Sequence, residues 1–262
     1  TDLGYAVEWK VINAGDYGFP QQRRRVFFIG YHKTTEIYKE IKKENKLIWL
    51  MKSSVISAAF PSSFISSFNL DEFTLDKDLV ELSNTFNSKK ENAESPFQNT
   101  GVMIGGKVFT TKTEAFYKGK RVTLGDILQE EKASTEFNVY KKDLKKWEYH
   151  KGSKTIKRIT NEGFEYDFSE GAMTFPDDLQ KPSRTIITAE GGKTPSRFKH
   201  VVKIKNKYRR LTPLELERLN MFPDNHTFHK GISNSQRAFF MGNALVVGII
   251  EKIGKQLSKE IR

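Results

Sequence analysis

The densest positive charge near the start of the chain lies in residues 16–29, DYGFPQQRRRVFFI. Arg23, Arg24 and Arg25 stand directly before the apolar run Val26–Ile29. Each guanidinium offers several N–H donors and a fixed positive charge, so it can hold a carbonyl oxygen or a phosphate. Taken alone, three adjacent arginines indicate a solvated or phosphate-contacting patch. Because they stand directly before a strand-like segment, the alternative is that a rigid strand holds their side chains in a fixed direction, toward a binding or active site.

The surrounding elements follow from hydrophobic patterning. Residues 5–14 (YAVEWKVINA) place Tyr5, Val7, Trp9 and Val11 on one face of an extended segment, which predicts a strand. Turn-forming residues 13–20 predict a loop. The unalternating run Val26–Ile29 is typical of a strand covered on both faces in an α/β sheet. Residues 34–45 show a charged helical pattern, and residues 46–204 read as a polar, irregular region.

Near the C-terminus, residues 210–223 (RLTPLELERLNMFP) carry an explicit helix start. Thr212 can cap, Pro213 suits the first helical position, and Glu215 completes a capping box. An apolar stripe predicts a last, amphipathic helix over residues 244–261. Asn243 before it reads by itself as an N-cap.

Composition limits the classes of function. The 262 residues carry 44 Lys and Arg against 32 Asp and Glu, a net charge of +12, which favours a polyanionic partner such as nucleic acid. A merely basic protein is the alternative. The chain has no cysteine, which excludes disulfides, thiolate metal sites and cysteine nucleophiles within it. No apolar run approaches the roughly 20 residues of a membrane span, so we expect a cytoplasmic protein without a membrane partner.

Four segments, in one order, resemble the C-terminal portion of a bacterial DNA (cytosine-5) methyltransferase. Residues 16–29 resemble the eighth conserved block of that family, residues 210–224 the ninth, and residues 241–247 (MGNALVV) the tenth. Residues 182–192 (PSRTIITAEGG) resemble the conserved end of its target recognition domain. The family's Gly-rich cofactor loop, Pro-Cys nucleophile and Glu-Asn-Val segment are not present.

The resemblance implies a chemistry in which the target base is flipped out of the duplex and attacked at C6 by a cysteine thiolate before C5 takes the methyl group of S-adenosyl-L-methionine. It makes Arg25 the candidate for contacting cytosine O2, with Arg23 beside it ordering the pocket. Arg24 should point to the opposite side of the strand. Without a cysteine, we expect the isolated chain to be inactive.

The resemblance also assigns binding residues. Asn243 and Ala244 are expected to bind S-adenosyl-L-methionine near the start of the last helix. His200 is open between a DNA contact and an ordinary packed histidine. No spacing of His, Asp or Glu suggests a metal site. The residues expected to contact DNA are Gln21, Gln22, Thr185, Gly191, Gly192, Lys193, Ser196, Arg197 and Lys199.

The expected fold class is α/β: a partial Rossmann-like S-adenosylmethionine-dependent methyltransferase sheet with an inserted, irregular α+β target recognition domain. Residues 1–31 would supply strands of the catalytic domain, residues 32–225 the recognition domain with its supporting helix, and residues 226–262 the return to the catalytic domain. The expected function is sequence-specific cytosine-5 methylation of double-stranded DNA in a restriction-modification system, completed by an N-terminal half or partner subunit. The alternative is a non-enzymatic DNA-binding module or a methylase remnant.

Overall fold

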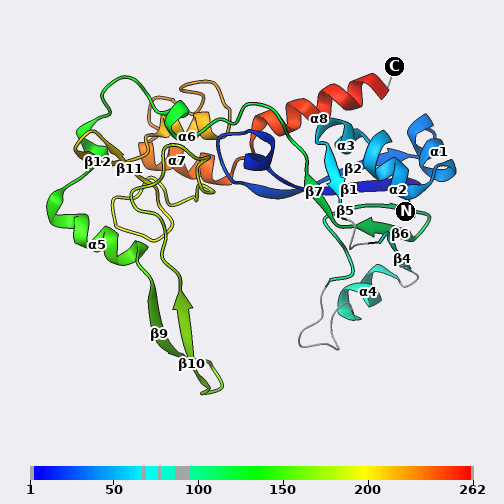
Figure 1. Ribbon diagram of the computed structural model, residues 1–262, viewed down its shortest axis with the longest axis horizontal. Coiled ribbons are helices and arrows are strands. Elements are labelled where there is room, and N and C mark those ends of the chain that lie inside the picture. The colour runs from blue at the N-terminus through cyan, green and yellow to red at the C-terminus, as the bar shows by residue number, and fades with distance from the viewer. Residues whose placement is uncertain (1–2, 66–68, 76–77, 86–94, 261–262) are drawn as a thin grey trace. The chain divides into compact units, whose positions relative to one another are not determined.

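The structure is a computed structural model that describes residues 3–65, 69–75, 78–85 and 95–260 (Figure 1). Its contacts divide the chain into two compact units. The first contains Thr1–Gly18, Arg24–Lys120 and Ile249–Arg262, and the second contains Phe19–Arg23 and Arg121–Gly248. Both units combine helices and strands, so the chain is a mixed α/β protein. Residues 32–120 group with the first unit, and the predicted domain boundaries at 31/32 and 225/226 stay a prediction.

A five-stranded sheet organises the first unit. Its order is β2-β1-β5-β6-β4, and each neighbouring pair is antiparallel. The predicted first strand is confirmed as β1, and the apolar run falls in β2. A second, two-stranded sheet pairs β3 with β7. The strands are β1 Tyr5–Asn13, β2 Arg24–His32, β3 Ser62–Phe64, β4 Asp71–Thr74, β5 Thr100–Ile104, β6 Lys107–Thr111 and β7 Thr113–Ala115.

The helices of the first unit are short except for the last. The predicted charged helix is confirmed as α1 Glu36–Lys43, capped by Thr35. The others are α2 Lys46–Ile48, a π-helical turn Trp49–Ser53, α3 Val55–Ala59, α4 Leu79–Thr85 and, from Ile249 onward, α8 Val247–Glu260. The last helix starts three residues later than the predicted residue 244, and its predicted end at Ile261 lies outside the described residues. In the part of the chain that the structure describes, no helix is long and apolar enough to cross a bilayer.

The buried face of β1 carries two ionisable side chains. Glu8 accepts a 2.6 Å hydrogen bond from the Tyr31 hydroxyl, and Lys10 donates to Ser62 Oγ at 2.8 Å and to the Phe60 carbonyl at 3.0 Å. Burial raises the pKa of Glu8. Burial also lowers the pKa of Lys10 to about 8, against the opposing effect of the Glu8 charge. The alternating pattern of β1 was predicted correctly. Its two charged residues, Glu8 and Lys10, nevertheless lie on a buried face of the sheet.

The expectation that Val26–Ile29 is covered on both faces is wrong. Val26 and Phe28 are 46% and 64% exposed. They flank an apolar hollow of about 460 Å³ with Trp9 and Met103 in its lining. The physical reason is that β2 is the edge strand of an antiparallel sheet, and that its residues Val26 and Phe28 border an open hollow that Leu75 and Phe97 line without covering them.

The second unit packs two helices and a small sheet around one apolar core. Strands β11 Val201–Ile204, β12 Lys207–Arg210 and β8 Asn138–Val139 form an antiparallel sheet in that order. Helices α6 Pro213–Leu219 and α7 Asn234–Asn243 lie beside it, and α6 begins with the predicted capping box of Thr212 and Glu215. Helix α5 Lys141–Lys151 leads into a separate antiparallel ribbon, β9 Lys154–Ile159 and β10 Glu165–Glu170 (Figure 1). The core residues are Leu124, Ile127, Ile186, Val202, Leu211, Leu216, Leu219, Ala238 and Met241.

Candidate functional site

Segments from all four sequence motifs meet around Gln21 in the second unit. Gln21 is fully buried, and its Nε2 donates to the Leu219 carbonyl at 2.9 Å and to Asn220 Oδ1 at 2.6 Å. Asn220 Nδ2 in turn donates to the Met241 carbonyl at 2.8 Å. The backbone of Ser183 forms an isolated parallel bridge with Gln21. The motif residues are therefore held together by a continuous set of buried hydrogen bonds.

Arg23 extends this network. Its side chain is 2% exposed, and the guanidinium donates to the Ile186 carbonyl at 3.2 Å and to the Gly242 carbonyl at 2.9 Å. Gly242 packs so closely on Thr188 that an added Cβ would lie 2.4 Å from Thr188 backbone atoms. This arrangement supports the predicted ordering role of Arg23, because both acceptors belong to segments of the motifs.

Thr185 and Gln22 meet at the same place. The Thr185 hydroxyl donates to the Gln22 carbonyl, and the Gln22 N–H donates to the Ser183 carbonyl at 2.6 Å. The structure thus brings Gln21, Gln22 and Thr185 together, as expected for one site. Whether they contact DNA stays a prediction.

Arg25 lies in a different setting from Arg23. Arg24 and Arg25 are the first residues of β2 in the first unit, paired with Asn13 and Ile12 of β1, and both are exposed. Arg25 donates to the carbonyl of Arg24 at 2.7 Å. Arg24 and Arg25 are consecutive in β2, and side chains alternate along a strand, so their placement is consistent with the prediction that they lie on opposite faces. An exposed guanidinium is free to be recruited by a ligand.

The predicted glycine loop is packed against its own unit. A Cβ on Gly191 would lie 2.6 Å from the Ser235 Cα, and one on Gly192 would lie 2.8 Å from Lys199 Nζ. Lys199 is 6% exposed, and its ammonium donates to the Gly192 and Thr194 carbonyls at 3.1 and 2.8 Å. Burial, and then the Arg210 charge, lower its pKa. These bonds support a structural role for Lys199, whereas Lys193 at the loop surface is exposed.

The other predicted contacts flank this loop. Arg197 donates to the Gly152 carbonyl at 3.4 Å and to the Gly171 carbonyl, and its Nε lies 3.4 Å from Glu170. Ser196 is half-buried and caps the N–H of Phe198 at 3.4 Å. The guanidinium of Arg197 therefore joins the loop to the base of the β9–β10 ribbon.

A buried polar chain that sequence reasoning did not find lies under the loop. His200 Nδ1 is 2.8 Å from Glu190 Oε1, and its Nε2 is 3.0 Å from Ser183 Oγ. Although burial raises the pKa of Glu190, the charge and hydrogen bonds of His200 together hold it below its usual value. His200 is 0% exposed, so the alternative of a packed histidine is the correct one. The only local signal was the acidic residue Glu190, directly before the pair Gly191 and Gly192.

Asn243 does not cap the last helix. It is the final residue of α7, where its Nδ2 donates to the Phe239 carbonyl at 3.1 Å, and α8 begins four residues later. The N-cap interpretation is therefore wrong, because a short extended link separates the two helices. The side chain of Asn243 is exposed and Ala244 is half-buried. An exposed amide oxygen can accept a hydrogen bond from a ligand hydroxyl or ammonium, which fits a cofactor contact.

Comparison with known proteins shows to which family a chain with these motifs belongs. The model of the C-5 cytosine-specific DNA methylase family matches residues 1–259. The chain belongs to this family. It is 39% identical over 262 residues to the type II methyltransferase M.Sau3AI of Staphylococcus aureus, covering 99% of this chain and 60% of the relative. It is 26% identical over 294 residues to the orphan methyltransferase M.SPBetaI of Bacillus phage SPbeta, covering 98% of this chain and 59% of the relative.

The methylase chain therefore spans about 60% of the length of the curated relatives that it matches over nearly all of its residues. Among solved structures, the Dnmt2 methyltransferase of S. pombe superposes with a TM-score of 0.49 at 11% identity, over 100% of this chain and 60% of that one. The resemblance drawn from the four motifs is confirmed at the level of the family.

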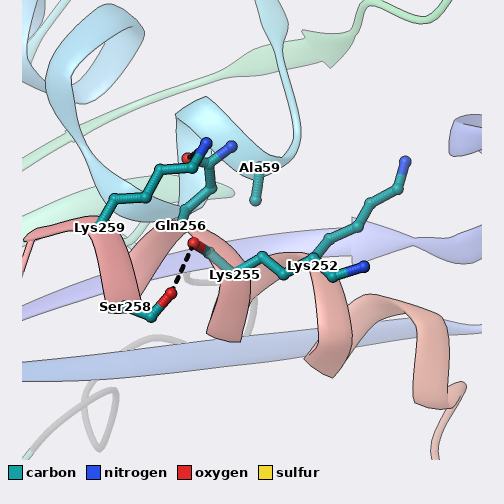
Figure 2. A pocket seen from close by; sticks show the side chains of 6 residues that line it. All are labelled: Ala59, Lys252, Lys255, Gln256, Ser258 and Lys259. Atoms are coloured by element: carbon teal, nitrogen blue, oxygen red, sulfur yellow. Dashed lines mark hydrogen bonds between the residues drawn. The ribbon is translucent and has the colours of Figure 1, made fainter.

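A second surface hollow of this methylase contains none of the predicted residues. Figure 2 shows lysines of α8 around a hollow of about 590 Å³, where the Ser258 hydroxyl donates to the Lys255 carbonyl at 3.0 Å. Its lining comprises Ala59, Lys252, Lys255, Gln256, Ser258 and Lys259. Within the described ranges, no three His, Asp or Glu side chains gather as a metal site would require.

Proposed function

We propose that the chain supplies the DNA recognition part, and part of the active site, of a sequence-specific DNA (cytosine-5) methyltransferase of a restriction-modification system. The observation that carries the proposal is the buried network around Gln21 and Arg23, which joins the eighth, ninth and tenth motifs to the recognition segment at Thr185. Such a network keeps the side chains of a site in a fixed geometry. Membership of the family supports the same reaction class.

In this proposal Arg25 and Arg23 have different roles. Arg25, exposed at the start of β2, donates N–H groups to O2 of a cytosine that has been flipped out of the duplex. The positive charge of its guanidinium stabilises the electron density that the ring gains during reaction. Arg23 acts through its bonds to Gly242 and Ile186, which makes it a positioning residue.

The cofactor would be S-adenosyl-L-methionine, which supplies the methyl group when bound. Asn243 and Ala244 would contact it, with the exposed amide of Asn243 as hydrogen-bonding partner. The nucleophilic cysteine is missing from the 262 residues, so an N-terminal half outside them, in a longer chain or in a partner subunit, would bring it. The isolated chain would then bind double-stranded DNA without methylating it.

Complementation tests this proposal. The chain is mixed with the part of M.Sau3AI that lies outside the region of similarity, and transfer of tritiated methyl groups from S-adenosyl-L-methionine to DNA is measured. We expect activity only in the mixture. Arg25→Ala should abolish it while DNA binding persists, and Arg24→Ala should retain it.

The possible outcomes separate the two candidate functions. Full activity of the Arg25→Ala mixture would refute the assignment of Arg25. Salt-dependent DNA binding by the chain without any reconstituted activity would favour the alternative, a DNA-binding module or methylase remnant.

A further inference from the structure

Four lysines of α5 share one exposed face. They are Lys141, Lys142, Lys145 and Lys146, while Trp147, 1% exposed, and Lys151 anchor the opposite face in the second unit. Residues four apart on a helix are neighbours, so the positive charges stand side by side and disfavour the helix. In the part of the chain that the structure describes, none of the four lysines forms an ion pair. An anion along this face would relieve the repulsion.

The ribbon that follows α5 is exposed on both faces. Strands β9 and β10 pair over six residues each, and Lys154 and Glu170 at its base form a 3.1 Å ion pair. Figure 1 shows the ribbon extending beyond α5. A two-stranded ribbon is one of the shapes that fit the major groove of B-DNA. An isolated hairpin is only marginally stable in water, so such an element gains order when a partner covers it.

Arg158 is held on this ribbon in a geometry suited to reading a base. Its guanidinium lies over the Phe168 ring at 3.6 Å from the centroid. Stacking occupies the flat face of the guanidinium and leaves its N–H edge open, and no hydrogen bond to that edge is found among the described residues. A fixed guanidinium edge matches the O6 and N7 acceptors of guanine.

Arg197, which follows the glycine loop at Gly191 and Gly192, contacts the ribbon at its base. Arg197 donates to the carbonyl of Gly152, between α5 and β9, and to that of Gly171, directly after β10. It also lies 3.4 Å from Glu170. Helix and ribbon are therefore fastened to the same loop, so they can act as one body.

We propose that residues 141–170 form a DNA-binding arm, in which the lysine face of α5 holds phosphates while the β9–β10 ribbon enters the major groove and Arg158 reads a guanine. The inference rests on the proposed function, because it assigns the recognition of double-stranded DNA to this element. The four unpaired lysines on the exposed face of α5 attract the DNA phosphates. The β9–β10 ribbon carries both positive and negative side chains, so it adds little net attraction to DNA. Its role in the proposal is to discriminate between bases.

The phosphate contacts are tested by salt dependence. Binding of the chain to fluorescein-labelled duplexes of random sequence is measured by anisotropy over a series of salt concentrations. Replacing the four lysines of α5 by glutamine should make the slope of log K against log salt less steep by about 2 to 4, since each phosphate contact contributes about 0.9. The control replaces Lys33, Lys39, Lys42 and Lys43, four exposed lysines at and before α1, with the same loss of charge. It should change the slope by less than about 1.

The reading contact is tested by sequencing the duplexes that the chain selects from a random pool. We expect a G·C pair to be enriched, and Arg158→Met and Arg158→Lys each to reduce that enrichment tenfold or more. Arg158→Lys keeps the charge, so its overall affinity should stay close to that of the wild type. Lys157→Met, a change on the other face of the same strand, should keep the sequence preference. Circular dichroism of each variant confirms that the fold is intact.

The outcomes distinguish this inference from the proposed function. If the wild-type chain binds DNA but the α5 variant keeps its salt slope, or the α1 control loses as much, the arm is refuted while the proposed function stands. Unchanged base preference in both Arg158 variants, or no preference in the wild type, refutes the reading role. If the wild type shows no salt-dependent binding to duplex DNA at all, the proposed function itself fails.

Discussion

The guanidinium of Arg23 donates a 2.9 Å hydrogen bond to the carbonyl oxygen of Gly242, which lies 219 positions further along the chain. A second bond, to the Ile186 carbonyl, ties in the recognition segment. One side chain of the eighth motif thus connects the segments of two others. Arg23 is 2% exposed, so the carbonyl dipoles of Gly242 and Ile186 must stabilise its positive charge in place of water.

Removing this bridge should destabilise the protein. Arg23→Met leaves the two buried carbonyls without their donor, and we expect the free energy of unfolding to fall by about 3 kcal/mol in urea denaturation. Arg24→Met, at an exposed neighbour, should change it by less than about 0.5 kcal/mol. Equal stability of the two variants would contradict the structural role of Arg23.

The close approach at Gly242 predicts a second effect. In Gly242→Ala the new Cβ would lie 2.4 Å from backbone atoms of Thr188, so the link between α7 and the recognition segment must shift. We expect a loss of about 2 to 3 kcal/mol in thermal or urea unfolding. Gly254→Ala is the control, because nothing lies within 4 Å of its Cβ in α8, and it should stabilise by up to about 1 kcal/mol. A stable Gly242→Ala variant would show that the contact is not tight.

The capping box of α6 is part of a buried ion pair. Glu215 is fully buried and accepts from Arg209 at 2.6 and 2.7 Å and from the Thr212 N–H at 2.9 Å. Glu215→Gln removes the charge that compensates Arg209 and should cost about 3 kcal/mol. Glu251→Gln breaks an exposed pair with Lys255 and should cost less than about 0.5 kcal/mol. Differential scanning calorimetry compares the two, and similar melting temperatures would argue against the pair.

Lys10 predicts a dependence of stability on alkaline pH. Burial lowers its pKa to about 8 in the folded protein, from the ordinary lysine value of 10.5. Between these values the unfolded chain keeps a proton that the folded chain has released, so stability rises with pH. The Lys10 contribution should amount to about 1.5 kcal/mol between about pH 8 and pH 9.5, and Lys10→Met should lack it. The range stays below the titration of Tyr31, whose pKa burial and Glu8 raise further.

The control for this pH effect is the surface lysine variant Lys39→Met. Its curve of unfolding free energy against pH should run parallel to that of the wild type. A wild-type curve that is parallel to the Lys10→Met curve would mean that Lys10 stays protonated in the folded state.

The sequence by itself determined the family, the order of the motifs and the elements whose signals are local. Thr212 and Glu215 are three residues apart, so their capping box forms wherever the helix begins, and α6 starts as predicted. The alternation of residues 5–13 likewise predicted β1. These interactions involve neighbours along the chain, and side-chain type and spacing are enough to specify them.

Only the tertiary structure decided which of these residues are buried and what they contact. Arg23 and Arg25 look equivalent in the motif, yet Arg23 is enclosed by carbonyls of distant segments and Arg25 is exposed. Lys199 lies in a basic stretch, but its ammonium donates to carbonyls of its own loop. Asn243 was expected to cap the last helix, but it is the final residue of the preceding helix α7. Burial depends on segments far apart in the sequence that meet only when the chain folds, so no local pattern of charge or hydrophobicity encodes it.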